Sequence, residues 1–231
     1  MSIYAIADLH LSFDETVDKP MDIYGGVWVE HAENLKKNWE ETISGEDTVL
    51  IPGDISWALK FSQAVVDLDW LHALPGKKIL LKGNHDLWWG SIGKLNKLYD
   101  DVMFIQNNFY EAEGYAICGS RGWVCPGDDD FTEHDSKIYL RELLRLEASL
   151  QAAKASGAQK ILGIMHFPPT NDKQQRSGFT MLFEKYGAEQ VCYGHLHGEE
   201  GFRNGISGVL NSIEYKLVSL DYLKCMPLKI V

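Results

Sequence analysis

Residues that could bind metal ions recur at the ends of short apolar runs in this 231-residue chain. Runs rich in Ile, Val and Leu are typical of buried strands, and carboxylates, imidazoles and amide oxygens are ligands for divalent cations. The candidates are Asp8 and His10 in "YAIADLH", Asp54 in "VLIPGD", Asn84 in "ILLKGNHD", His166 in "ILGIMH", and His195 and His197 in "VCYGHLH". Seven donors are too many for one closed tetrahedral zinc site and suit two cations that share a carboxylate. Asp54 has two oxygens and could be the shared ligand.

Each of these elements has a plainer interpretation when taken alone. A D-x-H sequence at a strand end is often an N-cap followed by a loop histidine, and a single residue such as His166 is more often structural than a ligand. In combination, however, five of the eight histidines follow predicted strands. His195 and His197 are two residues apart, so an extended chain points both side chains the same way. We therefore predict one shared metal site.

Strands that alternate with helices must bring these scattered residues together. The expected strands cover 2–7, 48–52, 78–82, 115–119, 160–165, 190–194 and 215–220, and the expected helices cover 30–43, 60–73, 136–156 and 178–186. Asp135 is a plausible N-cap for the third helix, and 125–135 is expected to be a long loop. This order predicts βαβ units and a largely parallel sheet, with an antiparallel part after residue 190. In open α/β sheets, the carboxyl ends of parallel strands line the ligand crevice.

The composition indicates a soluble globular protein with a sizeable core, and one domain over 1–231 is the simplest organisation. Lys and Arg number 22 against 33 Asp and Glu, so the formal charge of −11 disfavours nonspecific binding to nucleic acid. The four cysteines form no C-x-x-C pair and the N-terminal residues lack the pattern of a signal peptide, which predicts a cytoplasmic protein. No apolar run approaches the roughly 20 residues that span a bilayer.

The motifs "DLH", "GD", "GNHD", His166 and "GHLH", in this order over residues 8–197, resemble the signature of the calcineurin-like metallophosphoesterase superfamily. The resemblance implies an α/β fold, a four-layer α/β/β/α sandwich of two mixed sheets, with a dinuclear metal site at the carboxyl ends of the strands. It assigns one ion to Asp8, His10, Asp54 and His197, and the other ion to Asp54, Asn84, His166 and His195. It also gives His85 the role of an acid or an electrostatic clamp.

Charge explains why an amide would suit position 84. Two divalent ions carry four positive charges, and Asp8, Asp54 and a bridging hydroxide remove three, which leaves a positive centre for a phosphate ester. Asn84 supplies a ligand oxygen without cancelling that charge. We therefore expect a metal-dependent phosphoesterase in which His85 and Asp54 are catalytic and a metal-bridging hydroxide attacks a small phosphomonoester or phosphodiester. Oxygen and imidazole ligands suit Mn²⁺, Fe, Zn²⁺ or Co²⁺ as the two ions.

One departure separates the chain from protein Ser/Thr phosphatases, which carry G-D-x-x-D-R-G. Here the run is "GDISWALK", with Trp57 and Ala58 in place of the Asp that supports the catalytic histidine and the Arg that grips phosphate. Asp86 or a backbone carbonyl would then have to orient His85. Arg121 could grip phosphate instead, as could Arg176 or Arg203, although each could equally be a solvated surface arginine.

Two rival functions remain open at this point: a nuclease, and a noncatalytic scaffold on the same fold. Other residues have plainer interpretations. Trp88 and Trp89 could stack on a planar group but are expected to pack in the core, as is Cys192. We expect His31, His72 and His134 at the surface and the "DDD" run at 128–130 in a solvated loop tip.

Overall fold

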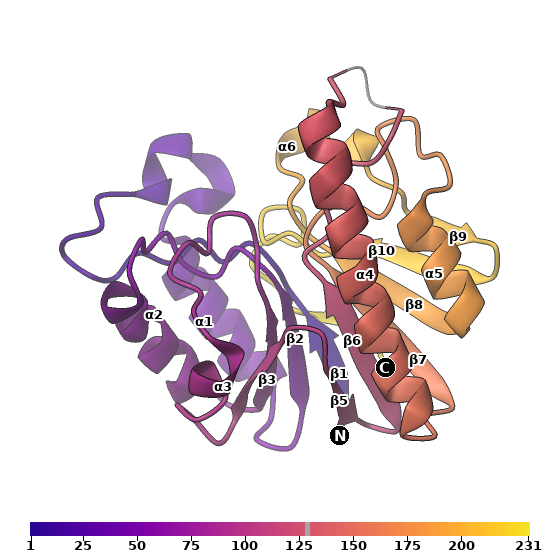
Figure 1. Cartoon of the computed structure of the whole chain (residues 1–231). Coiled ribbons are helices and arrows are strands. Elements are labelled where there is room, and N and C mark those ends of the chain that lie inside the picture. The colour runs from indigo at the N-terminus through magenta and orange to yellow at the C-terminus, as the bar shows by residue number, and fades with distance from the viewer. Residues whose placement is uncertain (128–129) are drawn as a thin grey trace.

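The computed structural model describes residues 1–127 and 130–231, and these form two β-sheets between helices (Figure 1). The first sheet has the order β11 (Leu228–Lys229), β1 (Ile3–Ala5), β2 (Thr48–Pro52), β3 (Lys77–Leu81) and β4 (Val102–Ile105). The second has the order β5 (Phe109–Ala112), β6 (Tyr115–Ser120), β7 (Lys160–Met165), β8 (Ala188–Tyr193), β10 (Ile213–Leu217) and β9 (Gly208–Leu210).

Parallel pairing dominates the middle of both sheets. Strands β1 to β4 are parallel neighbours, and so are β6, β7, β8 and β10. Antiparallel strands lie at the edges, where β11 pairs with β1, β5 with β6, and β9 with β10. The predicted parallel core and the antiparallel part after residue 190 are therefore both present. The second sheet differs from expectation in one respect, because β10 joins it through parallel pairing with β8.

Helices cover the outer face of each sheet (Figure 1). Helices α1 (His31–Thr42), α2 (Phe61–Ala73) and α3 (Ile92–Leu95) lie on the side of the first sheet, and α4 (Glu133–Ala155) and α5 (Gly178–Tyr186) lie on the side of the second. Helix α6 (Gly198–Asn204) follows β8, and two short 3₁₀ helices, η1 (Met21–Tyr24) and η2 (Gly26–Trp28), precede α1. The predicted four-layer α/β/β/α sandwich is confirmed.

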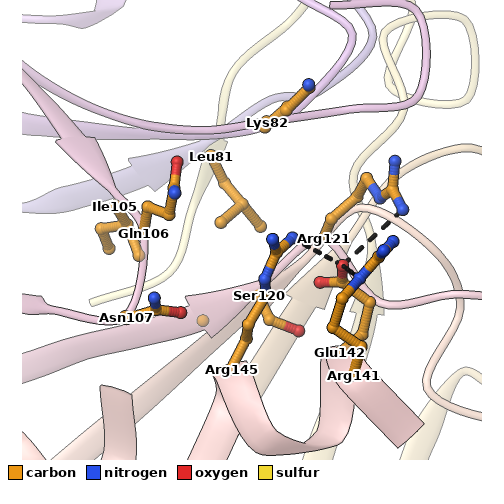
Figure 2. Close-up of a pocket in the computed structure, with 11 residues that line it drawn as sticks. Leu81, Lys82, Ile105, Gln106, Asn107, Ser120, Arg121, Arg141, Glu142 and Arg145 are labelled. Atoms are coloured by element: carbon orange, nitrogen blue, oxygen red, sulfur yellow. Dashed lines mark hydrogen bonds and ion pairs between the residues drawn. The ribbon is translucent and has the colours of Figure 1, made fainter. Parts of the chain in front are cut away.

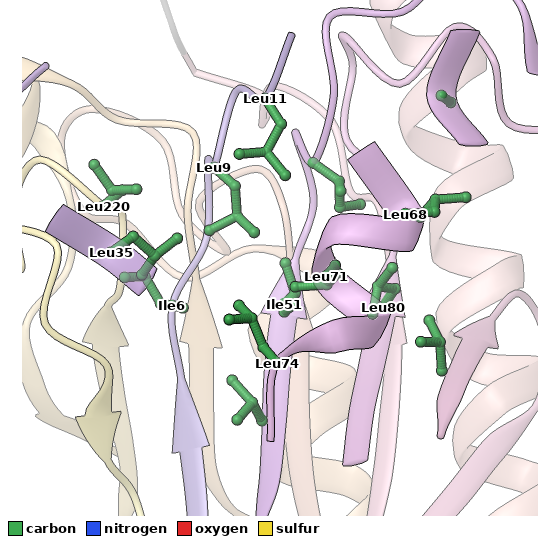
Figure 3. Packing of buried hydrophobic residues seen from close by; sticks show 14 of the residues in the cluster. Ile6, Leu9, Leu11, Leu35, Ile51, Leu68, Leu71, Leu74, Leu80 and Leu220 are labelled. Carbon is green, nitrogen blue, oxygen red and sulfur yellow. The ribbon is translucent and has the colours of Figure 1, made fainter. Parts of the chain in front are cut away.

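Burial on both faces explains why the central strands are continuously apolar. Every residue of β2 is buried. Val49 and Ile51 pack toward the helices, whereas Leu50 packs toward the other sheet. Figure 3 shows Ile51 near Leu71 of α2, and both belong to the cluster between the first sheet and its helices. The two sheets thus share an inner apolar layer, and each sheet shares an outer layer with its helices.

The N-terminus of α4 differs in detail from the prediction. Thr132, rather than Asp135, is the N-cap: its hydroxyl accepts a hydrogen bond from the Asp135 N–H at 3.2 Å. The Asp135 carboxylate in turn accepts from the Thr132 N–H at 3.0 Å, which completes a capping box. The helix therefore begins inside the predicted loop, and residues 128 and 129 of the "DDD" run lie outside the described residues. No helix in the described part of the chain is long and apolar enough to cross a membrane.

Candidate metal centre

Seven predicted ligands lie at the carboxyl ends of β1, β2, β3, β7 and β8, where the two sheets meet. Backbone hydrogen bonds tie the first two strand ends together: the Asp8 N–H donates to Gly53 O and the His10 N–H to Asp54 O, both at 3.0 Å. The His195 N–H donates to the Asp8 carboxylate at 2.9 Å, which links the second sheet to the first. The structure therefore brings residues nearly two hundred positions apart into one cluster.

One half of the cluster centres on His10 and His197. Their Nε2 atoms face each other at 3.4 Å. Asp54 Oδ2 lies 3.9 Å from the His10 Nε2, and Asp8 Oδ1 lies 4.0 Å from the His197 Nε2. Atoms of Asp8, His10 and His197 all lie within 4.8 Å of one another, a spacing that one ion could bridge. This grouping contains three of the four residues that the sequence pattern assigned to the first ion.

The other half centres on His166, which is fully buried. Its Nε2 lies 2.7 Å from Asn84 Oδ1, 3.3 Å from His195 Nδ1 and 3.4 Å from Asp54 Oδ2. These are the four residues assigned to the second ion. Asp8 Oδ1 also lies 3.7 Å from His166 Nδ1, and Asp8, Asp54 and His166 form a second compact donor group. The seven side chains therefore lie together in one cluster, whereas their role as metal ligands and their division between two ions stay predictions.

Backbone conformation marks the same residues as unusual. Asp8, His10, Asp54 and His195 have φ values of 61°, 47°, 50° and 74°, in the left-handed region that non-glycine residues rarely adopt. Each such residue costs on the order of 1–3 kcal/mol, and strain of this kind gathers at functional sites. Four strained residues lie within one cluster. The backbone there is therefore held in a costly conformation that places the ligand side chains close together.

Glycine at position 83 is required by the close approach of two strand ends. A Cβ atom there would lie 2.0 Å from Asp54 Oδ1 and 2.2 Å from the Asp54 N. Glycine at position 194 has a similar role, since its Cβ would lie 2.5 Å from Asp8 Oδ2. The glycines of "GNHD" and "GHLH" therefore make room for the two carboxylates.

Two hydrogen-bond acceptors orient His166 and His197 from the side of each ring that faces away from the cluster. The Pro52 carbonyl lies 3.1 Å from His166 Nδ1, and the Asp221 carboxylate lies 3.0 Å from His197 Nδ1. If each Nδ1 carries the proton, each Nε2 keeps a lone pair facing the cluster, which is the arrangement that metal-binding histidines use. Asp221 was not among the residues predicted from the sequence. A signal was present, because Asp221 directly follows the predicted strand 215–220.

The protonation states of the cluster suit cations. Burial lowers the pKa of His10 and of His195 to about 3, so both imidazoles are neutral and can act as ligands. Burial raises the pKa of Asp8 to about 6. Burial alone would lower the pKa of His166, but the carboxylates of Asp54 and Asp8 outweigh it and raise that pKa to about 9. A proton on His166 thus balances two buried carboxylates, a role that a metal ion would take over.

His10 Nδ1 is also buried without a hydrogen-bond partner among the described residues. The donor set therefore fits divalent metal ions.

A cavity of about 360 Å³ opens over this cluster. His10, Asp54, His85, His195 and His197 form its floor, and Met21, Tyr24, Trp28 and Trp57 complete its lining. Trp57 stacks on His10 with ring centroids 4.7 Å apart and contacts His85 at 4.3 Å. The residue that replaces a carboxylate of the protein phosphatases is thus an aromatic wall of the cavity.

His85 places a partly exposed imidazole in this cavity. Its backbone N–H donates to Asp54 Oδ1 at 2.8 Å, and its side chain is 44% exposed with Nε2 4.0 Å from Asp54 Oδ2. Burial lowers the pKa of His85. Asp86 does not orient the ring in the described structure. Its carboxylate instead accepts hydrogen bonds from the backbone of Ile55, Ser56 and Gly83 and from the Trp88 indole.

The arginines considered as phosphate grips lie elsewhere. Arg121 lines a separate pocket, where it lies 3.7 Å from Glu142, and its proposed contact with substrate stays a prediction. Arg176 is exposed and paired with Glu184, and Arg203 is exposed on α6. The surface interpretation thus fits Arg176 and Arg203.

Other predictions can be compared directly with the structure. Trp88, Trp89 and Cys192 are buried, as expected, and His72 and His134 are exposed, as expected. The prediction for His31 was wrong. This residue is 8% exposed, its Nε2 lies 3.0 Å from Leu9 O, and it packs on Trp28. His31 lies on the buried face of α1 and therefore supports Trp28, which lines the cavity.

Two mixed sheets that place buried carboxylates and imidazoles at the ends of their parallel strands define a metal-binding α/β sandwich protein. The sequence model of the calcineurin-like phosphoesterase family matches residues 1–199, and the chain belongs to this family.

The curated relatives are proteins of mycobacteriophages. The gene 66 protein of Mycobacterium phage L5 is 42% identical over 57 residues, which cover 25% of this chain and 27% of the phage protein. The gene 66 protein of phage D29 is 33% identical over 106 residues, which cover 44% of this chain and 50% of the phage protein. The chain therefore spans half or less of the length of these relatives.

Two solved structures share the fold over almost the whole chain. One is a protein of unknown function from Aquifex aeolicus, with a TM-score of 0.52, 19% identity, and coverage of 99% of this chain and 95% of that one. The other is the phosphopantetheinyl hydrolase of Mycobacterium tuberculosis, with a TM-score of 0.59, 15% identity, and coverage of 100% and 95%. Both structures also cover the residues beyond 199, so the similarity in fold continues past the part of the chain that the family model matches.

Proposed function

We propose that the protein is a dinuclear metal-dependent phosphoesterase that hydrolyses a small phosphomonoester or phosphodiester. The observation that supports this most is the cluster of Asp8, Asp54, Asn84 and four histidines, of which Asp54, His10, His195 and His197 line an open cavity together with His85. A noncatalytic scaffold has no need for strained donors that face a cavity. The formal charge of −11 argues against a nuclease.

Two divalent transition-metal ions bound in the cluster would offset the charge of the phosphate and lower the pKa of a water molecule toward neutrality. Among the residues, Asp54 lies between the two donor groups and is the proposed shared ligand. Asn84 offers an oxygen without a charge. His85 stands at the cavity with a partly exposed imidazole and would donate a proton to the leaving oxygen or hold a phosphate oxygen.

The cavity walls favour a leaving group with a planar or apolar portion. Trp28 and Trp57 contact the metal-binding histidines, and Met21 packs against the Trp57 indole nitrogen with its sulfur 3.3 Å away. Aromatic faces bind planar groups by stacking and bury apolar area. We infer that an aryl or bulky alkyl phosphate is a better substrate than methyl phosphate. A cytoplasmic setting is also inferred, since the buried thiols of Cys118 and Cys192 suit a reducing compartment.

The test is a turnover assay on matched esters. Metal-loaded protein is assayed with nitrophenyl phosphate, bis(nitrophenyl) phosphate, alkyl phosphates and a single-stranded oligonucleotide, each with Mn²⁺, Zn²⁺ or Co²⁺. We expect hydrolysis of at least one small ester, loss of turnover on chelation, recovery on adding metal, and no turnover in Asp54→Asn. The Asp69→Asn variant removes an exposed carboxylate elsewhere and should retain wild-type rates. Wild-type rates in Asp54→Asn, or no hydrolysis of any small ester, would reject the proposal.

A further inference from the structure

A second pocket lies apart from the metal centre, between the ends of β3, β4 and β6 and the side of α4 (Figure 2). Its volume is about 220 Å³. It is lined by Leu81, Lys82, Ile105, Gln106, Asn107, Gly119, Ser120, Arg121, Arg141, Glu142 and Arg145. None of these residues lines the cavity over the metal ligands. The pocket is therefore a distinct place where a ligand could bind.

Positive charge is concentrated in this pocket to a degree that the composition does not predict. Three of the five arginines of a chain with a formal charge of −11 lie here, together with Lys82. Glu142 is the opposing charge and is fully buried. Its Oε1 lies 2.8 Å from the Arg145 Nη1, 3.7 Å from the Arg121 Nη2 and 3.8 Å from the Arg141 Nε, and Figure 2 shows these three side chains gathered around it. Three arginines thus share one carboxylate, and Lys82 adds a fourth positive charge to the pocket lining.

Polar atoms in the pocket are left without partners. Arg121 Nε and Glu142 Oε2 are both buried, and neither has a hydrogen-bond partner among the described residues. A buried donor without an acceptor is costly, and native structures rarely keep one without a reason. The guanidinium of Arg121 is held beside Trp123, with its carbon 4.7 Å from the ring centroid, and its side chain is 18% exposed. An anion in the pocket would balance the excess positive charge.

Neutral donors accompany the arginines. The Ser120 hydroxyl oxygen accepts from the Gly122 N–H at 3.2 Å, so the Ser120 O–H remains able to donate. Gln106 accepts from the Trp89 indole through Oε1 at 3.2 Å, which leaves its amide hydrogens available. Several guanidinium groups with nearby hydroxyl and amide donors suit a small tetrahedral oxyanion, because Arg binds phosphate through paired N–H groups.

We propose that this pocket binds a small phosphate-class anion, either inorganic phosphate or the phosphoryl group of a small metabolite, at a site separate from the metal centre. The volume is too small for a nucleic acid, and the negative charge of the whole chain disfavours one. Arg121 connects the two sites through its backbone. Its carbonyl accepts the N–H groups of His166 and Phe167 at 3.2 and 2.9 Å while its side chain lines the pocket.

Titration calorimetry on metal-loaded protein at constant ionic strength tests this proposal, with inorganic phosphate and pyrophosphate as probes. Wild type should bind phosphate with one component that survives in Asp54→Asn, the variant that disables the metal centre. Arg145→Gln should weaken that component by about tenfold or more, because a charge-assisted hydrogen bond is lost. Arg176→Gln makes the same change at an exposed ion pair and should alter the affinity by less than about twofold. Pyrophosphate binding more tightly than phosphate would identify a metabolite phosphoryl group as the source, and tighter binding of phosphate would identify the free ion.

Two further variants keep the test decisive if Arg145→Gln does not fold. Arg141→Gln alters a residue whose side chain is 54% exposed and should also weaken the metal-independent component. Glu142→Gln removes the competing carboxylate and should tighten binding severalfold. Loss of all phosphate binding in Asp54→Asn, or equal binding in wild type, Arg141→Gln and Arg145→Gln, would overturn the proposal. The arginines would then serve to neutralise Glu142.

Discussion

Replacing Asp221 by asparagine should weaken one metal site while leaving the other intact. The Asp221 carboxylate lies 3.0 Å from His197 Nδ1 and accepts the Gly198 N–H at 3.1 Å. Burial alone would lower the pKa of His197, but Asp221 and Asp8 raise it, which shows that the imidazole is held against negative charge. Asparagine keeps an acceptor oxygen at this position but removes the charge that makes the imidazole a stronger ligand.

The expected loss of metal affinity depends on how far the Asp221–His197 pair is screened by solvent. Losing an acceptor that orients a metal-binding histidine costs about 10- to 100-fold in metal affinity, or about 1.4–2.7 kcal/mol. The Asp221 side chain is 6% exposed and that of His197 is 33% exposed, so solvent screens the pair only partly. We therefore expect Asp221→Asn to lose about 10- to 30-fold. Asp221→Ala should lose more, because the Gly198 N–H would also lose its acceptor.

The assay is a calorimetric titration of Mn²⁺ into protein stripped of metal by a chelator. His197 belongs to one of the two proposed ligand groups, so one of two binding steps should weaken and the other should stay within about twofold. Asp69→Asn is the control, because it removes an exposed carboxylate that contacts the Tyr99 hydroxyl on another part of the surface. Unchanged affinity in both steps, or equal loss in both, would refute this reasoning.

Three further predictions concern residues of "GNHD". His85→Asn should reduce kcat/KM by about 10²- to 10⁴-fold on an alkyl phosphate and far less on the nitrophenyl ester, if His85 protonates the leaving oxygen. Equal losses on both esters would leave it as a clamp on phosphate. Asn84→Asp should keep both ions, measured by elemental analysis, but lose turnover, because the added carboxylate cancels positive charge; undiminished turnover at equal metal content would contradict this. Gly83→Ala should abolish metal binding or folding, since its Cβ would lie 2.0 Å from Asp54 Oδ1, whereas Gly90→Ala has open space and should be tolerated in thermal unfolding and metal titration. A Gly83→Ala protein with normal metal affinity would disprove the steric argument.

The residues of the candidate metal centre could be grouped from the sequence alone because parallel strands all run in the same direction. Asp8, Asp54 and His166 are far apart in the chain, yet each follows an apolar run that is buried on both faces. Such runs are long enough to read as strands, and their carboxyl ends must meet at one edge of a sheet. The same rule would have identified Asp221, which follows "YKLVSL", had it been applied to every predicted strand.

Edge strands and cavity walls were harder to predict. Strand β5 is half-exposed and four residues long, and β11 has two residues, so neither shows a clear apolar pattern. The walls depend on tertiary contacts: Trp28 belongs to a short 3₁₀ helix, and Trp57 stacks on a histidine from another strand end. The spacing of residues along the sequence does not predict contacts of this kind.

The arginine pocket shows the same limit. Arg141 and Arg145 are one helical turn apart in an amphipathic helix, where charged residues usually form a solvated face. Glu142 lies on the same helix, and Arg121, from the end of β6, meets it because α4 packs on the second sheet. Sequence spacing could therefore not distinguish a binding pocket from a charged surface.

The most direct test of the central claim is the metal content of the purified protein. Elemental analysis after dialysis, combined with titration of the stripped protein, should find two divalent transition-metal ions per chain and parallel loss of metal and phosphoesterase turnover on chelation. Asp54→Asn should hold fewer ions, because the carboxylate of Asp54 lies between both donor groups. At most one tightly held ion per wild-type chain, with turnover that survives chelation, would contradict the account.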